Sequence, residues 1–526
     1  MALLIEPYAT AAPGRAAVVD DRGSVTWAEL DDRVVRLIDA LRRRGLTPGA
    51  TVAVFAGNQR ESIEVMLACM HAGWLVVPVN WHWVAAELAY VLDDADADVL
   101  VVADAWVDVA AEAIASTGRE ILTIAIGEHG AAGFERYEEV VAGGGPGPAN
   151  DLVFGGPMFY TSGTTGFPKG VRSVLGRTGG PVEMWQLIAG GIGATIGVAG
   201  PETDGGTTLL LCGPVYHSAQ WVFTFATLLG GGTVVLHHRF DAARLLADID
   251  RYAVTSLHLV PAQMVRLLRL DDATRAAFRG DSLRRVHHGA APCPESVKRA
   301  MIDWWGPIVD EYYGGTEGGF ITMISAADWL ERPGSVGRAL PTVELRVVDE
   351  DGAELPPGSV GDLYFRNLLG SDFEYHKAPA KTAAAHREPG VGTLGDVGWL
   401  DEDGFLHLSD RRIDMIISGG VNIYPAEIEG LLSGHPAVAD VAVFGIPDDE
   451  MGERVMAVVE PAAPVSGSAA ERALIADLTE LCRSQLAGYK CPRSWEVAER
   501  LPRNEAGKLA KRLLRDPYWS NTSRSI

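Results

Sequence analysis

The segment YTSGTTGFPKGV, residues 160–171, has the composition in this chain that best suits phosphate binding. It combines glycines, hydroxyl side chains and a single lysine. Backbone N–H groups and hydroxyls in such a loop can surround phosphate oxygens, and Lys169 adds a positive charge. It is not a Walker A loop, because Pro168 precedes the lysine and no serine or threonine follows it. A plain surface turn is the alternative, but it does not account for this order of residues.

The elements that must hold this loop show an alternating pattern. Residues 26–45 place Leu30, Val34 and Leu37 at helical spacing, with Thr26 as a plausible N-cap. Residues 51–57 are a short apolar strand, and residues 61–73 form a helix that ends at a glycine. Strand and helix repeat in this way until about residue 290. Such alternation predicts parallel sheets covered by crossover helices.

The pattern changes after Gly334. Turn dipeptides and alternating apolar residues then predict antiparallel β structure, and the last part of the chain mixes strands with a helix. One hydrophobic core stops growing near roughly 250–300 residues, so a 526-residue chain predicts at least two units. We place the boundary near Asp410–Asp414. The expected fold is α/β, with a large N-terminal domain (residues 1–411) of mixed parallel sheets, helices and a β-subdomain, and a small α+β domain (residues 412–526).

Charge and cysteine content exclude several classes of function. The formal net charge of −24 disfavours binding to nucleic acid or to anionic membrane surfaces. The five cysteines have no CxxC spacing, which argues against a disulfide framework and fits a reducing compartment. No basic segment followed by an apolar run marks a secretory signal, and the longest apolar stretch is shorter than the roughly 20 residues of a membrane span. We therefore expect a cytoplasmic protein.

Five segments together resemble the motifs of the adenylate-forming superfamily, which contains acyl-CoA synthetases, adenylation domains and luciferases. Besides the loop above, they are GAAP (289–292), YYGGTEGG (312–319), GDVGWLDEDGFLHLSDRRIDMIISGGVNIYPAEIE (395–429) and LPRNEAGKLAKRLLR (501–515). They occur in the superfamily's order and span nearly the whole chain. The likeness is greatest to bacterial acyl-CoA ligases.

The resemblance implies a role for each matching residue. The phosphate loop would hold the β- and γ-phosphates through Thr161, Ser162, Gly163, Thr164, Thr165 and Lys169. Glu317 would ligate Mg²⁺, with Thr164 as a second metal contact, and Thr316 would bond the α-phosphate. A metal ion and a lysine can stabilise the charge that develops when a carboxylate attacks an anionic phosphate.

The nucleoside and the C-terminal lysine are assigned in the same way. Tyr313 would stack on adenine beside Gly314, and the other side of the base would meet Gly289, Ala290 and Ala291. Asp396 would accept both ribose hydroxyls with support from Arg411, because one carboxylate suits two neighbouring hydroxyls. Lys508 would bridge the substrate carboxylate and the α-phosphate. The implied cofactors are ATP, Mg²⁺ and coenzyme A.

Relatives carry out two half-reactions, between which the small domain rotates. The first forms acyl-AMP and pyrophosphate, and in the second a thiol displaces AMP. Gly419 and Gly420 would border the pantetheine tunnel, since glycine permits close approach of a narrow ligand. The hinge position departs from the family pattern, because Ile413 stands where many relatives have aspartate or lysine.

The acid pocket is the least constrained part of the sequence. His217, Trp221, His288 and Gly315 are the residues we expect to line it, with Phe223 as further apolar wall. No fixed charge suits an amino-acid ammonium group. We expect an apolar acid, with a bulky or cyclic one such as a steroid- or terpenoid-derived acid as the leading case and a medium-chain or aryl acid as the rival. The histidine doublets do not predict a metal site, because neighbouring side chains in a strand face opposite sides.

The leading functional hypothesis is an AMP-forming acyl-CoA ligase. One alternative is an adenylating enzyme that passes acyl-AMP to a partner protein or a separate thioesterifying enzyme. A second, from another class, is a non-catalytic nucleotide-binding relative. Homodimerisation is left open, since nothing in the sequence decides it.

Overall fold

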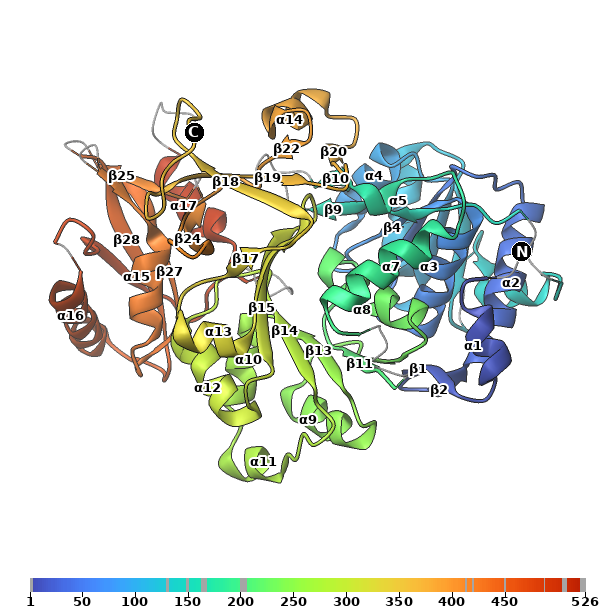
Figure 1. Ribbon diagram of the computed structural model, residues 1–526, viewed down its shortest axis with the longest axis horizontal. Helices are drawn as coiled ribbons and strands as arrows, with labels where there is room; N and C mark the ends of the chain where they lie inside the picture. The colour runs from blue at the N-terminus through green and yellow to red at the C-terminus, as the bar shows by residue number, and fades with distance from the viewer. Residues whose placement is uncertain are drawn as a thin grey trace.

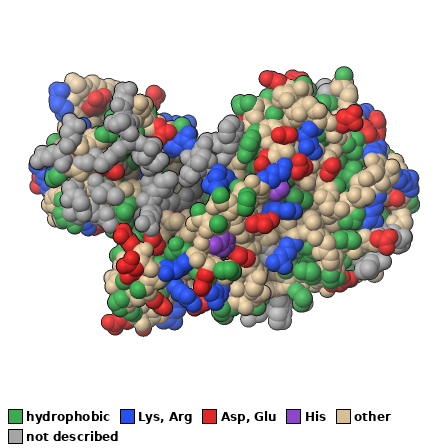
Figure 2. All heavy atoms as spheres, turned by 90° about the horizontal axis from the view of Figure 1, so that it is seen from above, with side chains coloured by type: hydrophobic (Ala, Val, Ile, Leu, Met, Phe, Trp, Pro, Cys, Tyr) green, Lys and Arg blue, Asp and Glu red, His purple; other side chains and the backbone are tan. Residues whose placement is uncertain are grey.

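The computed structural model describes residues 3–128, 132–147, 151–161, 168–198, 206–411, 414–418, 421–448, 451–486, 488–503 and 509–520. In Figure 1 the N-terminal elements lie on the right, the middle of the chain lies in the centre and the C-terminal elements lie on the left. Figure 2, seen from above, shows acidic and basic side chains interspersed over the face in view.

A parallel sheet forms the core of the N-terminal part. Its strand order is β7-β6-β5-β3-β4-β8, and every pairing in it is parallel. Parallel strands with helices on both faces are buried, and β3 and β5 are buried along their whole length. The strands are β3 (Thr51–Phe55), β4 (Leu75–Pro78), β5 (Val99–Ala103), β6 (Leu122–Ile126), β7 (Glu135–Arg136) and β8 (Gly156–Pro157).

Two helices of this part, α2 and α3, match the helices expected over residues 26–45 and 61–73. Thr26 caps α2 (Trp27–Arg43) in a capping box with Glu29, and α3 (Arg60–Ala72) ends at Gly73, whose φ is 75°. The other helices here are α1 (Glu6–Ala11), α4 (Ala85–Asp94), α5 (Val107–Thr117), α6 (Tyr137–Ala142), α7 (Met184–Thr195) and α8 (Ser218–Leu229), with 3₁₀ turns at Asp104–Trp106 and Val174–Gly176.

A second, larger sheet runs through the centre of the molecule. Its order along the main path is β2-β1-β12-β11-β13-β14-β15-β16-β17-β24-β23-β19-β22-β21, and β18 also pairs with β19. Pairing is parallel from β1 to β15 and antiparallel from β15 onward. The parallel half comprises β1 (Ala16–Asp20), β11 (Thr208–Leu211), β12 (Thr233–Leu236), β13 (Ser256–Leu259), β14 (Arg285–His288) and β15 (Val309–Gly315), edged by β2 (Gly23–Thr26).

The antiparallel half confirms the expected change to antiparallel structure, but the change begins at β16, before Gly334. It comprises β16 (Gly319–Ile324), β17 (Gly337–Ala339), β18 (Val343–Val348), β19 (Gly361–Asn367), β21 (His386–Glu388), β22 (Val391–Gly392), β23 (Asp396–Leu400) and β24 (Phe405–Arg411). The helices that accompany this sheet are α9 (Ala242–Arg251), α10 (Pro261–Leu268), α11 (Asp272–Ala277), α12 (Glu295–Trp305), α13 (Ala326–Glu331) and α14 (Pro379–Ala384).

Two small sheets complete the fold. One is the antiparallel ribbon β20-β10-β9, formed by β9 (Phe159–Thr161), β10 (Lys169–Arg172) and β20 (Glu374–Tyr375). The other is the C-terminal sheet, built from β25 (Ile416–Ser418), β26 (Val421–Ile423), β27 (Val438–Asp448), β28 (Gly452–Pro461) and β29 (Ser494–Val497), with α15 (Pro425–Ser433), α16 (Ser468–Gln485) and α17 (Lys511–Trp519).

This architecture confirms the expected fold class, a large α/β N-terminal part and a small C-terminal α+β part. The exact boundary near Asp410–Asp414 stays a prediction; β24 ends at Arg411, and Ile413 lies outside the described residues. No helix in the described ranges is long and apolar enough to cross a bilayer.

A buried ion pair joins α12 to β15. The Nζ atom of Lys298 lies 2.6 Å from Oε2 of Glu311, and the two side chains are 1% and 8% exposed. The Nε2 atom of His288 lies 3.6 Å from the same carboxylate oxygen. Because Glu311 is followed by Tyr312 and Tyr313 on β15, this pair fixes the strand that carries the Y-G-x-T-E segment against its supporting helix.

Removing one partner of this pair should destabilise the protein more than removing both. Lys298→Met leaves the Glu311 carboxylate buried without its counter-charge, which costs about 3–5 kcal/mol of unfolding free energy. The double variant Lys298→Met with Glu311→Leu should recover most of that loss. Chemical unfolding followed by tryptophan fluorescence checks this expectation, and equal destabilisation of the single and double variants would contradict it.

Candidate active site

The strands β9 and β10 hold the two ends of the predicted phosphate loop side by side. Thr161 pairs with Lys169 in the antiparallel register of this ribbon. Ser162, Gly163, Thr164 and Thr165 lie outside the described residues. Partial burial lowers the pKa of Lys169, the nearby Lys381 lowers it further, and Glu317 opposes both effects. Lys169 therefore lies at one end of the predicted phosphate loop, and Thr161 lies at the other.

The hairpin of β15 and β16 carries the predicted metal and α-phosphate ligands. Gly314 pairs with Phe320 and Gly315 with Gly319, so Thr316 and Glu317 occupy the turn. A Cβ at Gly314 would lie 1.9 Å from the carbonyl oxygen of Gly319, so this strand position admits only glycine.

Thr316 and Glu317 each contact a different neighbouring element. The Thr316 hydroxyl lies 2.9 Å from the hydroxyl of Ser218, the first residue of α8. The Glu317 carboxylate accepts a hydrogen bond of 3.0 Å from the hydroxyl of Tyr375 on β20. The turn is therefore held from two sides, by α8 and by the ribbon that contains Lys169.

Two of the residues predicted to contact the nucleoside, Tyr313 and Asp396, are hydrogen-bonded to each other. The Tyr313 hydroxyl donates to Oδ2 of Asp396 over 2.8 Å, and both residues are buried. Asp396 begins β23 and pairs with Arg411 of β24 through the backbone; nothing is described of the Arg411 side chain. The structure thus places the predicted adenine and ribose contacts next to one another.

The GAAP segment follows β14 directly and lies against β15. A Cβ on Gly289 would lie 2.7 Å from the ring of Tyr312, so glycine permits this close approach. Ala290 has a φ of 66°, an uncommon conformation for a residue with a side chain. Ala291 is only partly buried. This turn is tightly specified at the position predicted to meet adenine.

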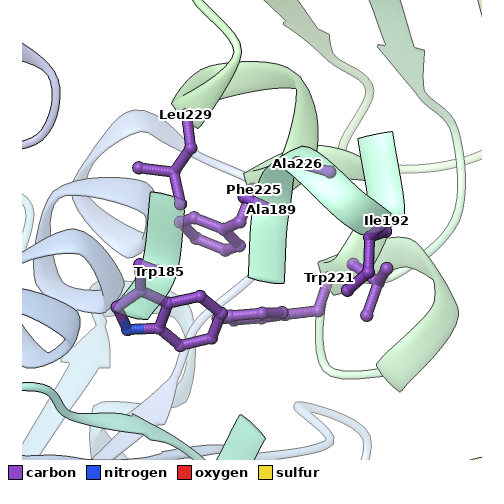
Figure 3. Close-up of a pocket in the computed structure, with 8 residues that line it drawn as sticks. Trp185, Ala189, Ile192, Trp221, Phe225, Ala226 and Leu229 are labelled. Atoms are coloured by element: carbon purple, nitrogen blue, oxygen red, sulfur yellow. The ribbon is translucent and has the colours of Figure 1, made fainter. Parts of the chain in front are cut away.

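The helix α8 and the preceding His217 carry residues that the sequence predicts to line the acid pocket. His217 is the residue before α8, and Trp221 lies one turn further along. The Trp221 ring centroid lies 5.7 Å from that of Trp185 on α7 and 4.4 Å from that of Phe225. Figure 3 shows Trp185, Trp221, Phe225 and Leu229 around a small apolar hollow between the two helices, with a cavity volume of only about 10 Å³.

The structure does not bring His288 together with His217 and Trp221. His288 lies on the face of β14 that packs against α12, beside Glu311 and Lys298. Its neighbour His287 lies on the opposite face, with its ring centroid 5.2 Å from that of Phe223 on α8. The two histidine side chains lie on opposite faces of the sheet, as expected. His287 rather than His288 faces α8, the helix predicted to line the acid pocket.

A short polar network runs behind α8. The Nδ1 atom of His258 lies 2.9 Å from Nε2 of Gln220 on α8, and its Nε2 atom lies 2.9 Å from the Tyr312 hydroxyl. Burial lowers the pKa of both His258 and His287 to about 3. These rings are therefore neutral near neutral pH, and this side of α8 adds no charge to the pocket.

Several residues predicted for the site lie in parts of the chain that the structure does not describe. Lys508, Gly419, Gly420 and Ile413 lie outside the described residues, so their roles stay predictions. Ser218 and Tyr375 were not predicted, although both contact predicted site residues. Ser218 directly follows His217 at the start of a helix, and this position in the sequence could have identified it as a candidate. Tyr375 is 58 residues from Glu317, and no local pattern connects the two.

Comparison with known families shows to which family the chain belongs. A family model described as AMP-binding enzyme matches residues 5–369, and one described as AMP-binding enzyme C-terminal domain matches residues 427–508. The chain belongs to the AMP-binding enzyme family. This confirms the family resemblance and the expected class, an AMP-forming acid–CoA ligase family enzyme.

Individual relatives are similar over almost their whole length. The chain is 34% identical to a feruloyl-CoA synthase of an Amycolatopsis species, across 95% of both chains. It is 32% identical to the fatty acid–acyl-carrier-protein ligase ScoC of Streptomyces coeruleorubidus, across 98% of this chain and 95% of that one. O-succinylbenzoate coenzyme A synthetase of Bacillus subtilis, solved with ATP and magnesium ion, superposes with a TM-score of 0.80 at 27% identity, covering 98% and 99% of the two chains.

The described residues fit a magnesium nucleotide. Mg²⁺ is usually bound by one or two carboxylates together with substrate phosphates, and Glu317 lies on the same side as Lys169, linked to it through Tyr375. Within the described ranges no cluster of three His, Cys, Asp or Glu residues could hold a metal by itself. A cation at this site would therefore need phosphate oxygens to complete its coordination.

The buried neutral histidines predict a pH dependence of stability. The pKa of His287 is 6.5 in the unfolded chain and burial lowers it to about 3 in the folded protein. Between these pH values the unfolded state therefore binds more protons than the folded state. The unfolding free energy should therefore fall as the pH drops from 6.5, by about 1.4 kcal/mol per pH unit for each such histidine. His287→Leu should reduce this slope in urea unfolding measured from pH 6.5 to 4.5.

Phe223→Leu is the matched control for this variant. It disturbs the same packing but removes no titrating group, so it should lower the stability at every pH and keep the wild-type slope. An unchanged slope in His287→Leu would show that His287 does not titrate on unfolding as described.

Proposed function

We propose that the protein activates an apolar carboxylic acid with ATP, forming acyl-AMP and pyrophosphate, and transfers the acyl group to coenzyme A. The observation that carries this proposal is the convergence of three tethered pairs, Thr316 with Ser218, Glu317 with Tyr375, and Tyr313 with Asp396. All three begin at one hairpin, and they supply a hydroxyl, a metal-binding carboxylate and a ribose acceptor.

In the first half-reaction a carboxylate oxygen of the acid attacks the α-phosphorus of ATP. The bond to the bridging oxygen breaks, and pyrophosphate leaves with the electron pair. Lys169 and the loop after Thr161 hold the leaving phosphates, while Thr316, oriented by Ser218, donates to the α-phosphate. Mg²⁺ bound at Glu317 would neutralise part of the phosphate charge. Lys508 would approach the two reacting anions.

In the second half-reaction the thiol of coenzyme A loses its proton and its sulfur attacks the acyl carbon, so that AMP leaves. Gly419 and Gly420 would border the path of the pantetheine arm. The domain boundary near Asp410–Asp414 would allow the C-terminal part to change orientation between the two steps. Ile413 departs from the family pattern at the hinge, and the similar ScoC is named for an acyl-carrier-protein acceptor. The identity of the acyl acceptor is therefore the part of the second half-reaction to test.

The acid is proposed to be apolar and to contain a ring. The helix α8, SAQWVFTFATLL, contains no charged residue, and Trp221, Phe223 and Phe225 are buried along it. Gly315 lies beside Glu317 at the reacting end. Two of the three relatives described above are named for ring-bearing acids, ferulate and succinylbenzoate. A steroid- or terpenoid-derived acid remains the bulkiest candidate, and aryl and medium-chain acids are its rivals.

Mass spectrometry of products from Mg·ATP and a pooled acid panel tests this proposal. The panel contains short, medium and long fatty acids, aryl acids and polycyclic acids, each with and without coenzyme A. An acyl-CoA of a ring-bearing acid is the expected product. Acyl-AMP that persists beside coenzyme A would favour an adenylating enzyme with a partner acceptor. ATP binding with no acid-dependent AMP release from any acid would favour a non-catalytic relative.

Asp396→Asn should weaken ATP binding selectively. The amide keeps the size of the side chain but loses the charge that accepts the ribose hydroxyls and the Tyr313 hydroxyl. We expect the KM for ATP to rise by about 10- to 100-fold, as for loss of hydrogen bonds to a charged group, with little change in the KM for the acid.

Asp403→Asn is the matched control for the ribose variant. Asp403 is an exposed aspartate paired with Arg332, and its replacement should leave both KM values unchanged. A rise in the KM for the acid that equals the rise for ATP in Asp396→Asn would argue against a ribose contact.

A further inference from the structure

Tyr375 lies between the two charges assigned to the phosphates and the metal ion, although it belongs to none of the motifs. It ends β20, and its backbone pairs with Val171 of β10. Figure 1 shows β20 and β10 side by side near the top of the molecule, between the N-terminal part and the central sheet. The strand that contains Lys169 is thus directly connected to the segment that contains Tyr375.

The side chain of Tyr375 contacts both charges. Its hydroxyl donates to Oε1 of Glu317 over 3.0 Å. The Nζ atom of Lys169 lies 5.2 Å from its ring centroid, within the range of a cation–π interaction. One rigid side chain therefore sets the positions of a carboxylate and an ammonium group that come from separate elements.

Tyr375 itself is held in place by its surroundings. Its backbone N–H donates to Oγ1 of Thr382 over 2.9 Å, and its ring meets Phe373 edge-on at 5.7 Å between centroids. The next residue, His376, donates its backbone N–H to the carbonyl of Gly170 over 2.8 Å. A Cβ on Gly170 would lie 3.0 Å from the His376 Cβ, so this glycine permits the close approach of the two strands.

We infer that Tyr375 is a positioning residue for the magnesium–nucleotide complex, acting through Glu317. This inference rests on the proposed function, in which Glu317 binds the metal ion. A hydrogen bond to one carboxylate oxygen fixes the orientation of the group and leaves the other oxygen, Oε2, for the cation. Partners of this kind, one step removed from the metal, typically change metal affinity by about 10- to 100-fold when they are lost.

Tyr375→Phe isolates the hydroxyl, because the ring and its contact with Lys169 remain. The assay is equilibrium binding of Mn²⁺ to the protein with saturating ATP, followed by electron paramagnetic resonance of free Mn²⁺. It needs no knowledge of the acid. We expect Mn²⁺ binding to weaken about tenfold, while binding of metal-free ATP in EDTA stays the same. In a Glu317→Gln background, Tyr375→Phe should have no further effect on Mn²⁺ binding, since the two residues act as one unit.

Tyr137→Phe is the matched control. It removes a tyrosine–glutamate hydrogen bond of 2.8 Å to Glu64, on α6 and α3, and leaves the site untouched. It should leave Mn²⁺ binding unchanged. Replacement of Tyr375 by 4-aminophenylalanine keeps a donor at the same position and should restore most of the Mn²⁺ affinity, which a general folding defect would not allow.

The outcomes separate this inference from the proposed function. If the wild-type protein binds neither ATP nor Mn²⁺ with ATP, the proposed function fails. If wild type binds both and Tyr375→Phe binds Mn²⁺ equally well, the inference is wrong. Equal weakening of metal-free ATP binding would also overturn it, because Tyr375 would then act on the phosphate loop alone.

Discussion

The tight crossing of backbone at Gly314 and Gly319 is the constraint on which the site depends. A Cβ at Gly314 would overlap the carbonyl oxygen of Gly319, so β15 and β16 can close into their narrow hairpin only with glycine there. From this hairpin three side chains extend to three separate elements: Tyr313 to Asp396 on β23, Thr316 to Ser218 on α8, and Glu317 to Tyr375 on β20. The hairpin therefore sets the relative positions of groups that are far apart in the sequence.

These tethers suit a reaction between two anions. A carboxylate that approaches a phosphate is repelled, and fixed donors and cations lower this cost only if they are oriented before the reaction. Side chains that are already held by hydrogen bonds within the protein lose little freedom when a nucleotide binds. The buried pair of Lys298 and Glu311 beneath β15 serves the same end, since it holds the strand from the side opposite to α8.

The sequence predicts the fold class well, because the fold class depends on local signals. The capped helix after Thr26 and the antiparallel strands after Gly334 follow from turn chemistry and periodicity. Contacts that depend on tertiary packing do not. A two-residue period separates His287 from His288, but only the packed structure shows which face of β14 meets α8. Tyr375 reaches Glu317 through the pairing of β20 with β10, for which the sequence between them holds no signal.

Because α8 contains no charged residue, the proposed function favours apolar carboxylic acids over charged ones as substrates. If the proposed acid packs against the face of α8 that carries Trp221 and Phe225, any fixed charge on it other than its carboxylate would be buried there, and an unpaired buried charge costs several kcal/mol, at the least roughly 3. The nearby His258 and His287 rings are held neutral by burial, and so they cannot supply a compensating cation near neutral pH. Under the proposed function, charged amino acids would be disfavoured by desolvation alone, whereas an apolar ring would lose no hydrogen bonds on packing against α8 and would be stabilised by leaving water.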